Sequence, residues 1–204
     1  MARDPSHPRD RPGDFWDQRY GGENPVFGHE PNQWLAANAD LLKPGMTALL
    51  PGDGEGRNGV WLAERGLTVT SVDASPVGVE KSQHLAAARG VSINAETADL
   101  RDWDAPEAAF DLVVLAFLHV GPDDRTELHR KLALTLKPGG LLLLEGFTPD
   151  HLGYGKGGPP DTGMMFTEDR LRDDFGDLLD IEHLEALKTE LPASERHGGP
   201  AAVI

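Results

Sequence analysis

The residues at positions 49–58, L-L-P-G-D-G-E-G-R-N, constrain the fold of this 204-residue chain more than any others. A short apolar run ends in three alternate glycines, Gly52, Gly54 and Gly56, and a helical pattern follows at once. Glycine lets the backbone turn tightly and lets a ligand approach, because it has no Cβ. The following helix would direct its free N–H groups and the positive end of its dipole at a ligand on the loop. Strand, glycine turn and helix in this order predict a site for a nucleotide-type ligand.

Charge and composition exclude several other functions. The net charge of −15 argues against a phosphate-binding face for nucleic acid and against an anionic membrane surface. The chain has no cysteine, which excludes disulfides, zinc–thiolate sites and a cysteine nucleophile. Its first residues lack the apolar segment of a signal peptide, and no apolar run approaches the roughly 18 residues of a membrane helix. We therefore expect a cytoplasmic protein that binds neither nucleic acid nor membrane.

Strand and helix patterns alternate through the middle of the chain. Strands are expected at 47–50, 67–72, 91–95, 110–117 and 141–147, and helices at 57–65, 76–89 and 123–136. The fourth strand, F-D-L-V-V-L-A-F, is nearly all apolar, as a central parallel strand covered on both faces would be. Ser75 is a suitable cap for the second of these helices, and Gly66 and Gly90 are suitable ends for the first two. The alternation predicts an α/β fold, a doubly wound and mostly parallel sheet with helices on both faces.

The two ends of the chain are less regular. Residues 1–13 are rich in proline and charge and are expected to form a mobile arm, followed by a single domain over 14–204. A helix is expected at 31–42, before Pro44-Gly45. Further strands at 178–187 and 201–204 would bring the sheet to seven, with the last strand incomplete. The glycine-rich segment 153–163 suits either a lid over the substrate or a flexible connection.

Two ligands fit the glycine loop. Residues 54–59 read G-x-G-x-x-G and Asp73 follows at the distance expected for an acid that binds a ribose, as in nicotinamide dinucleotide enzymes. The pattern G-x-G-x-G with an acid at the end of the second strand suits S-adenosylmethionine equally well. Asp73 does not discriminate, because both ligands present ribose hydroxyls to a carboxylate.

Other features favour S-adenosylmethionine. Asp99 follows the third strand, so it is expected at the carboxyl edge of the sheet, where a short acid can accept the exocyclic amine of adenine. The segment L-K-P-G-G at 136–140 is expected to turn the chain tightly before the fifth strand. The glycine motif contains one cation, Arg57, and no basic cluster that could neutralise a pyrophosphate.

Taken together, several segments resemble class I S-adenosylmethionine-dependent methyltransferases, and more narrowly the thiopurine and tellurite-resistance methyltransferase group. The resemblance covers most of the chain from Trp16 onward. It is carried by Trp16, Arg19-Tyr20, Phe27-Gly28-His29-Glu30, the glycine loop with E-G-R-N, W-L-A-E-R-G at 61–66, V-D-A-S-P-V-G at 72–78, L-K-P-G-G at 136–140 and E-G-F at 145–147.

The resemblance implies a role for each matching position. Trp16 and Phe27 would cover the sulfonium, which aromatic faces attract. Gly52, Asp53 and Gly54 would lie along the methionine part of the cofactor, and Asp73 would hold the ribose with Ala74 beside it. Asp99 and Leu100 would frame the adenine, and Ala116 would lie behind the transferable methyl group.

One position departs from the family pattern. Such enzymes often have an acid two residues before the first glycine, whereas this chain has Leu50 there. Asp53 stands where small or apolar residues are common. The ammonium group of the cofactor is therefore expected to be held differently, with Asp53 itself as the candidate.

Methyl transfer from a sulfonium is an in-line displacement, in which the protein supplies alignment and a dry site. A thiolate, selenolate or reduced tellurium species needs no enzymic base, whereas an oxygen or nitrogen nucleophile can need one. His119, after the fourth strand, is the candidate base, with capping of the strand end as the equally weighted alternative. His151 is expected to be a solvated loop residue and His197 a turn residue, and the scattered histidines do not make a metal site.

These observations predict a monomeric methyltransferase that acts on a small molecule with a soft nucleophilic atom. One alternative is a nicotinamide-dependent oxidoreductase built on the same sheet. The other is a protein that binds S-adenosylmethionine without turning it over. Measuring the binding of S-adenosylmethionine and of a nicotinamide cofactor distinguishes the methyltransferase from the oxidoreductase. Release of S-adenosylhomocysteine with a panel of acceptors distinguishes it from a protein that only binds the donor.

Overall fold

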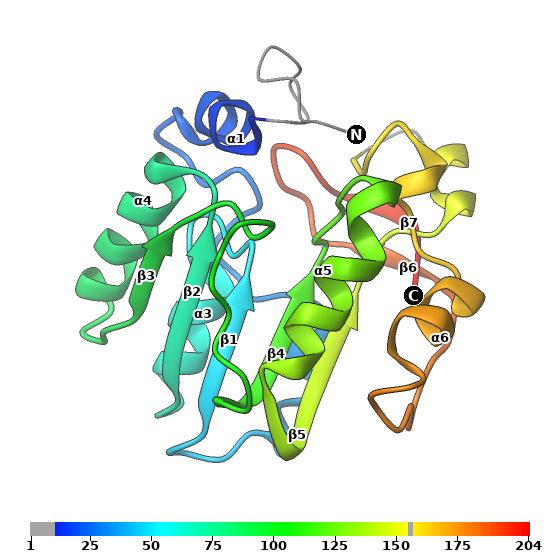
Figure 1. The fold of residues 1–204 in the computed structure, drawn as a ribbon. Coiled ribbons are helices and arrows are strands. Elements are labelled where there is room, and N and C mark those ends of the chain that lie inside the picture. Colours follow the sequence, from blue (N-terminus) through cyan, green and yellow to red (C-terminus); the bar gives the residue numbers. More distant parts are fainter. Residues whose placement is uncertain (1–10, 155–156) are drawn as a thin grey trace. The chain divides into compact units, whose positions relative to one another are not determined.

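The structure is a computed structural model that describes residues 11–154 and 157–204. The chain divides into two compact units, Met1–Asp104 and Ala105–Ile204, here called the N-terminal and C-terminal units. Each is described by itself (Figure 1). The expected arm at 1–13 falls largely on residues outside the described ranges, and the first helix, α1 (Pro12–Tyr20), begins within its last residues.

The N-terminal unit contains three parallel strands in the order β3-β2-β1. They are β1 (Thr47–Pro51), β2 (Thr68–Asp73) and β3 (Asn94–Thr97), with Thr47 opposite Thr68 and Asp73 opposite Thr97. Helix α3 (Arg57–Ala63) joins β1 to β2, and α4 (Pro76–Ala88) joins β2 to β3. Because the strands are parallel, β1 and β2 end at the same edge, and the glycine loop and Asp73 lie together there (Figure 1).

The local sequence explains where these helices begin. The Ser75 hydroxyl accepts a hydrogen bond from the Gly78 N–H at 3.0 Å, which confirms it as the cap of α4, and Pro76 occupies the first turn. Helix α2 (Gln33–Ala37) is capped in the same way by Asn32. The helix expected at 31–42 is shorter than predicted, because a 3₁₀ turn, η2 (Ala39–Leu41), follows the break at Asn38.

The C-terminal unit is built on a parallel pair, β4 (Phe110–Ala116) and β5 (Leu136–Glu145). Helix α5 (Pro122–Leu134) connects these strands, and α6 (Glu168–Phe175) packs against α5. Thr167 caps α6, because its hydroxyl accepts a hydrogen bond from Arg170 N at 3.3 Å. Two 3₁₀ turns, η3 (Pro149–Gly153) and η4 (Thr162–Met164), lie between β5 and α6.

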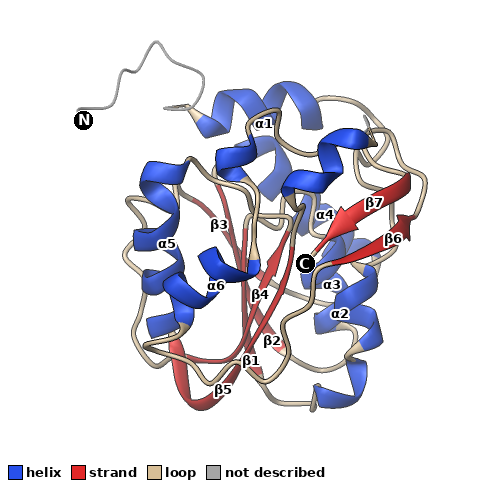
Figure 2. Ribbon diagram, turned by 90° about the vertical axis from the view of Figure 1, so that its right-hand side faces the viewer, coloured by secondary structure: helices blue, strands red, loops and turns tan. Residues whose placement is uncertain are grey.

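The expectation of seven mostly parallel strands is wrong. The described residues contain five parallel strands, whereas β6 (Leu187–Leu191) and β7 (Gly199–Val203) form an antiparallel pair (Figure 2). Residues 146–148, just after β5, also exchange antiparallel backbone hydrogen bonds with residues 202–204. The strand expected at 178–187 is displaced to β6, because its ladder with β7 begins at the Leu187–Val203 pair and leaves residues 180–186 without a partner strand.

Two other boundaries differ from the sequence expectation. The third strand begins three residues later than predicted, at Asn94. The fifth begins five residues earlier, because L-K-P-G-G joins β5 instead of forming a separate turn, with an irregular register between Phe110 and Leu112. Pro138 is tolerated because β5 lies at the edge of the parallel strands in the described part of the chain, with β4 as its neighbour.

Within the parts of the chain that the structure describes, none of the helices has the length and apolar character that crossing a bilayer requires.

Candidate functional site

The glycine loop has the backbone conformation that its sequence predicts. Gly52, Gly54 and Gly56 all have positive φ, at 68°, 57° and 86°. Residues with a Cβ rarely adopt these angles, so the alternate glycines are required by the turn itself. The loop closes through a hydrogen bond from Gly56 N to the carbonyl oxygen of Asp53 at 3.1 Å, and α3 begins directly after it.

The structure places Asp73 beside this loop. Its carboxylate is 5% exposed and accepts hydrogen bonds from Gly54 N and Ser75 N, each at 2.8 Å. Burial raises the pKa of Asp73, these two N–H donors lower it, and the neighbouring charge of Asp17 raises it further. Each carboxylate oxygen keeps a lone pair after accepting one N–H, so the group can still accept ribose hydroxyls.

Asp53 points toward the start of α3. Its Oδ2 accepts a hydrogen bond from Gly59 N at 3.0 Å. Its Oδ1 is shut off from solvent and has no hydrogen-bond partner among the described residues. Burial raises the pKa of Asp53 to about 7, opposed by the hydrogen bond from Gly59 and assisted by the charge of Asp73. Leu50, where the family often has an acid, is a core residue at 1% exposure.

The polar side chains of the glycine motif hold the segment 22–32 against the loop. Glu55 accepts a hydrogen bond from Val26 N at 2.7 Å, and Arg57 donates to the carbonyl oxygen of Phe27 at 2.8 Å. The amide oxygen of Asn58 accepts from Asn32 N at 2.8 Å. Sequence reasoning missed these contacts, since residues about 30 positions apart make them and neither segment shows a pattern that predicts its partner.

Aromatic residues from this N-terminal segment cover the loop. Trp16 stacks on Tyr20 with ring centroids 5.3 Å apart, and Phe27 lies 6.1 Å from Trp16. The Tyr20 phenol, 3% exposed, lies directly on Gly54, where a Cβ would collide with its hydroxyl. Burial raises the pKa of Tyr20 well above its ordinary value, and the nearby carboxylates of Asp73, Glu55 and Asp53 raise it further. The phenol is therefore protonated at neutral pH.

Helix α1 is attached to the start of α4 as well. The Ser75 hydroxyl donates to Asp17 Oδ1, which also accepts from Val77 N at 3.2 Å. Gly13 lies on the carbonyl of Ala74, where a Cβ would come within 2.5 Å of the oxygen. The structure thus brings Trp16, Phe27, the glycine loop, Asp73 and Ala74 together, as the resemblance implies. Whether they bind a cofactor stays a prediction.

Asp99 and Leu100 follow β3 in the same unit. Asp99 is engaged by Arg101, whose Nε lies 2.9 Å from Asp99 Oδ1 and whose Nη2 lies 2.5 Å from Oδ2. Leu100 is buried at 8% exposure. An adenine amine at Asp99 would share its carboxylate with the guanidinium of Arg101.

In the C-terminal unit, Ala116 ends β4 and Phe117 follows it with a φ of +56°. Such a value is an outlier for a bulky residue. The Phe117 ring packs on Phe147 at a centroid distance of 4.7 Å and on His197 at 5.3 Å. Ala116, which the resemblance places behind the methyl group, is therefore followed directly by a group of aromatic rings.

His119 has both ring nitrogens engaged by the backbone. Nδ1 lies 2.9 Å from the carbonyl oxygen of Met164 and donates to it, and Nε2 accepts from Phe147 N at 3.1 Å. Its ring stacks on Phe166 at 4.6 Å. Burial lowers the pKa of His119 to about 4, against the hydrogen bond to Met164, which raises it. This geometry favours the interpretation of His119 as a residue that fixes the strand end, and its role as a base stays a prediction.

His151, which was expected to be solvated, is buried at 2% exposure, and that expectation is wrong. Its ring stacks on Phe147 at a centroid distance of 3.9 Å. His197 lies in the expected turn and its ring also contacts Phe147, at 5.3 Å. The apolar surface of Phe147 accounts for both placements, and the local sequence around His151 gives no sign of it.

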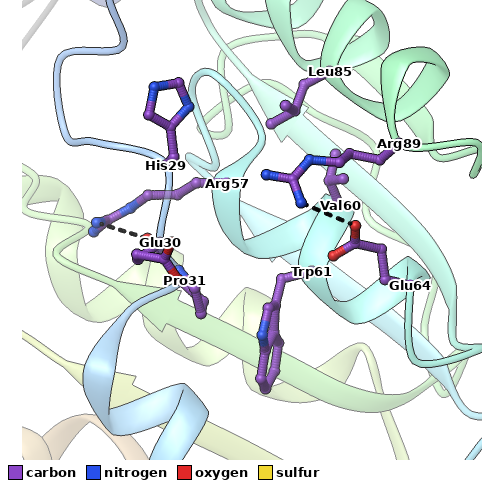
Figure 3. Close-up of a pocket in the computed structure, with 9 residues that line it drawn as sticks. All are labelled: His29, Glu30, Pro31, Arg57, Val60, Trp61, Glu64, Leu85 and Arg89. Atoms are coloured by element: carbon purple, nitrogen blue, oxygen red, sulfur yellow. Dashed lines mark hydrogen bonds and ion pairs between the residues drawn. The ribbon is translucent and has the colours of Figure 1, made fainter.

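A small hollow of about 60 Å³ lies between residues 29–31 and the helices α3 and α4 (Figure 3). Its arginines are already engaged, Arg57 by the carbonyl of Glu30 and Arg89 by the carboxylate of Glu64 (Figure 3). Small-molecule sites have volumes of roughly 300–1,000 Å³. This hollow is too small to hold a nucleoside.

Replacing Gly54 with alanine is expected to lower the free energy of unfolding by about 1–3 kcal/mol, through the left-handed backbone and the collision with Tyr20. Chemical denaturation measures the change. Gly45→Ala is the matched control, because Gly45 has a φ of +89° and open space around its Cβ position. Equal losses in the two variants would contradict the role assigned to the Tyr20 contact.

Comparisons with known proteins agree with this fold. Residues 49–140 match the family described as a methyltransferase domain. A structure from work on the conversion of a disulfide bond into a thioacetal group during echinomycin biosynthesis is 21% identical, with a TM-score of 0.76 over 97% of this chain and 90% of that one. TehB from Haemophilus influenzae is 18% identical, with a TM-score of 0.68 over 94% of this chain and 65% of that one. An S-adenosylmethionine-dependent methyltransferase from Methanosarcina mazei is 19% identical, with a TM-score of 0.63 over 82% of this chain and 94% of that one.

The match over residues 49–140 and the shared fold point to one class of protein. Both similarities support an S-adenosylmethionine-dependent methyltransferase with S-adenosylmethionine as the methyl donor. The N-terminal unit suits that cofactor, because the loop has glycine at positions 52, 54 and 56, its Gly54 N–H donates to the Asp73 carboxylate, and Asp53 lies within it. The nicotinamide-dependent alternative is not favoured by these findings.

Proposed function

We propose that the protein methylates a small molecule at a soft nucleophilic atom, a thiol or a selenium or tellurium species. When bound, S-adenosylmethionine supplies a methyl group on a positively charged sulfur, which leaves as a neutral thioether as the acceptor–carbon bond forms. A soft nucleophile is already ionised or reactive near neutral pH. The protein then needs to align it and to exclude water, without removing a proton.

The geometry of His119 is the observation that carries this proposal. It is the histidine that follows β4, and its Nε2 lone pair is used by the Phe147 N–H while Nδ1 donates to Met164. The rings of Phe147 and Phe166 stack on His119, and the ring of Phe117 packs on Phe147. A histidine whose lone pair is already used, packed among apolar rings, suits a polarisable acceptor that needs no base from it.

In the N-terminal unit, we propose that Asp73 holds the ribose, with Ala74 beside it, and that Gly52, Asp53 and Gly54 lie along the methionine part. Trp16 and Phe27 would cover the sulfonium, and Asp99 and Leu100 would frame the adenine. For Ala116, which ends β4 in the C-terminal unit, the role behind the methyl group that the resemblance implies stays a prediction. The similarity to TehB supports the narrower thiopurine and tellurite-resistance group. The similar structure linked to a disulfide-to-thioacetal conversion supports sulfur as the acceptor atom.

Release of S-adenosylhomocysteine with hydrosulfide, benzenethiol, selenide and telluride, compared with a phenol and an amine, tests the acceptor. We expect turnover with the soft acceptors and little with the phenol or the amine. A donor that binds while every acceptor fails would support the alternative of a binding protein without turnover. Preference for the phenol or the amine would overturn the proposed acceptor class.

Replacing His119 with asparagine is expected to reduce stability, since it removes the stacking on Phe166 and Phe147, but to leave the shape of the pH–rate profile with benzenethiol unchanged. Steady-state rates from pH 5 to 9 for both proteins provide the comparison. Loss of one limb of the profile in the variant would restore His119 as a catalytic base.

A further inference from the structure

The carboxyl group of Asp53 is only half partnered. Oδ2 accepts from Gly59 N at 3.0 Å, while Oδ1 is inaccessible to water and meets no donor in the described part of the N-terminal unit. Buried polar groups are almost always paired, because an ionised carboxylate loses its hydration on burial. A buried carboxyl with one free oxygen is therefore best accommodated with a bound proton.

The charges around Asp53 strengthen this tendency. Asp73 on β2 is a neighbouring negative charge, and Tyr20 on α1 is a neutral phenol. Glu55 in the loop is paired with Lys81 of α4 at 2.9 Å. Arg57 on α3 is the cation that lowers the pKa of Asp53, but it directs its guanidinium at the carbonyls of Phe27 and Glu30.

We propose that Asp53 makes the glycine loop sensitive to ligand charge: its carboxyl holds a proton in the free protein, releases it when the cationic donor binds, and thereby favours the donor over its neutral demethylated product. This inference rests on the proposed placement of the methionine part of the cofactor along residues 52–54.

The physical reason lies in the difference between the two ligands. S-adenosylmethionine and S-adenosylhomocysteine share the adenine, the ribose and the amino acid with its ammonium group, so any attraction between Asp53 and the ammonium acts equally on both. They differ in a methyl group and the positive charge on sulfur. A cation near a buried carboxyl stabilises its ionised form, and direct contact is not needed because the attraction is long-ranged in a medium of low dielectric constant. By linkage, ionised Asp53 strengthens donor binding by the same factor.

The sign of the pH dependence follows. Burial raises the pKa of Asp53 to about 7, so below that pH the carboxyl must lose its proton before it can attract the donor. Above that pH it is already ionised in the free protein. Donor affinity therefore rises relative to product affinity as the pH increases through 7.

Isothermal titration calorimetry of the full chain with S-adenosylmethionine and with S-adenosylhomocysteine, from pH 6 to 8, tests the inference. Titrations at each pH in two buffers of different ionisation enthalpy count the protons released. We expect more proton release with the donor than with the product near pH 7. We also expect the ratio of product Kd to donor Kd to rise by up to about tenfold, the change that one linked proton allows per pH unit below its pKa.

Asp53→Asn is the informative variant, because its amide oxygen can still accept from Gly59 N while the side chain cannot ionise. Its Kd ratio is expected to be independent of pH. Asp40→Asn is the matched control, since Asp40 is exposed on η2 and the substitution removes the same charge. The control is expected to behave as the wild type.

Thermal unfolding without ligand gives a second measurement. Because the pKa of Asp53 is higher in the folded than in the unfolded chain, its contribution to stability is present at low pH and is lost as the pH rises through about 7. The melting temperature of the wild type is therefore expected to fall relative to that of Asp53→Asn between pH 5 and 8.

The wild type could bind the donor while its ratio of product Kd to donor Kd does not change with pH, or changes equally in Asp53→Asn. Either result would overturn this inference alone. Failure of the wild type to bind either ligand would overturn the proposed cofactor placement, and this inference with it.

Discussion

Replacing Asp174 with alanine is expected to lower the free energy of unfolding by about 3–5 kcal/mol, the usual cost of removing one partner of a buried ion pair. Asp174, on α6, is fully buried, and its carboxylate receives three donors from α5. Arg125 Nε lies 2.7 Å from Oδ2, His129 Nδ1 lies 2.8 Å from Oδ2, and the Thr126 hydroxyl lies 2.7 Å from Oδ1. The alanine variant leaves the Arg125 guanidinium beside α6 without its carboxylate.

Urea denaturation at pH 7 measures this loss, and Asp173→Ala is the matched control, because Asp173 is exposed on the same helix. Burial raises the pKa of Asp174, but the hydrogen bonds from His129, Arg125 and Thr126 outweigh it and hold the pKa well below its usual range. The stabilisation is therefore complete above the unfolded pKa of about 3.9 and is lost as the pH falls below it. If Asp174→Ala were as stable as Asp173→Ala at pH 7, the hydrogen bonds to the Asp174 carboxylate would contribute nothing to stability.

The sequence predicted the backbone of the glycine loop and its neighbours well, because these features depend on local rules. The three alternate glycines predicted a turn with positive φ, and Ser75 predicted the start of a helix. The position of Asp73 beside the loop follows once β1 and β2 are parallel. Each of these features is decided within a few residues of the chain. The strand–helix alternation likewise predicted β1, β2 and β4 closely.

The features that the sequence did not reveal depend on partners distant in the chain. His129 and Asp174 are 45 residues apart, and His151 is buried because it meets the ring of Phe147. Likewise, β6 begins where β7 provides a partner and not where its own apolar residues begin. A single sequence contains no periodicity that identifies such pairs, so charged residues like Asp174 are read as solvent-exposed when they are buried.

Replacing Asp73 with alanine is expected to weaken donor binding by about 1.5–3 kcal/mol, or roughly 10- to 150-fold in Kd, for the loss of charge-assisted hydrogen bonds to the ribose. Titration calorimetry with S-adenosylmethionine and with S-adenosylhomocysteine measures the effect, which is expected to be similar for the two ligands because they share the ribose. The exposed Asp40→Ala serves as the control. Unchanged affinity in Asp73→Ala would remove the main support for the cofactor placement.

The Asp73 carboxylate also anchors Gly54 N and Ser75 N, so a loss of affinity could come from a displaced loop instead of a lost ribose contact. A double-mutant cycle separates the two causes. The 2′-deoxy form of S-adenosylhomocysteine lacks one ribose hydroxyl. We expect it to bind the wild type more weakly than the parent compound does, and to bind Asp73→Asn with the same affinity as the parent compound. If the deoxy compound lost the same affinity in both proteins, the carboxylate would act on the loop alone, and the ribose would be bound by another group.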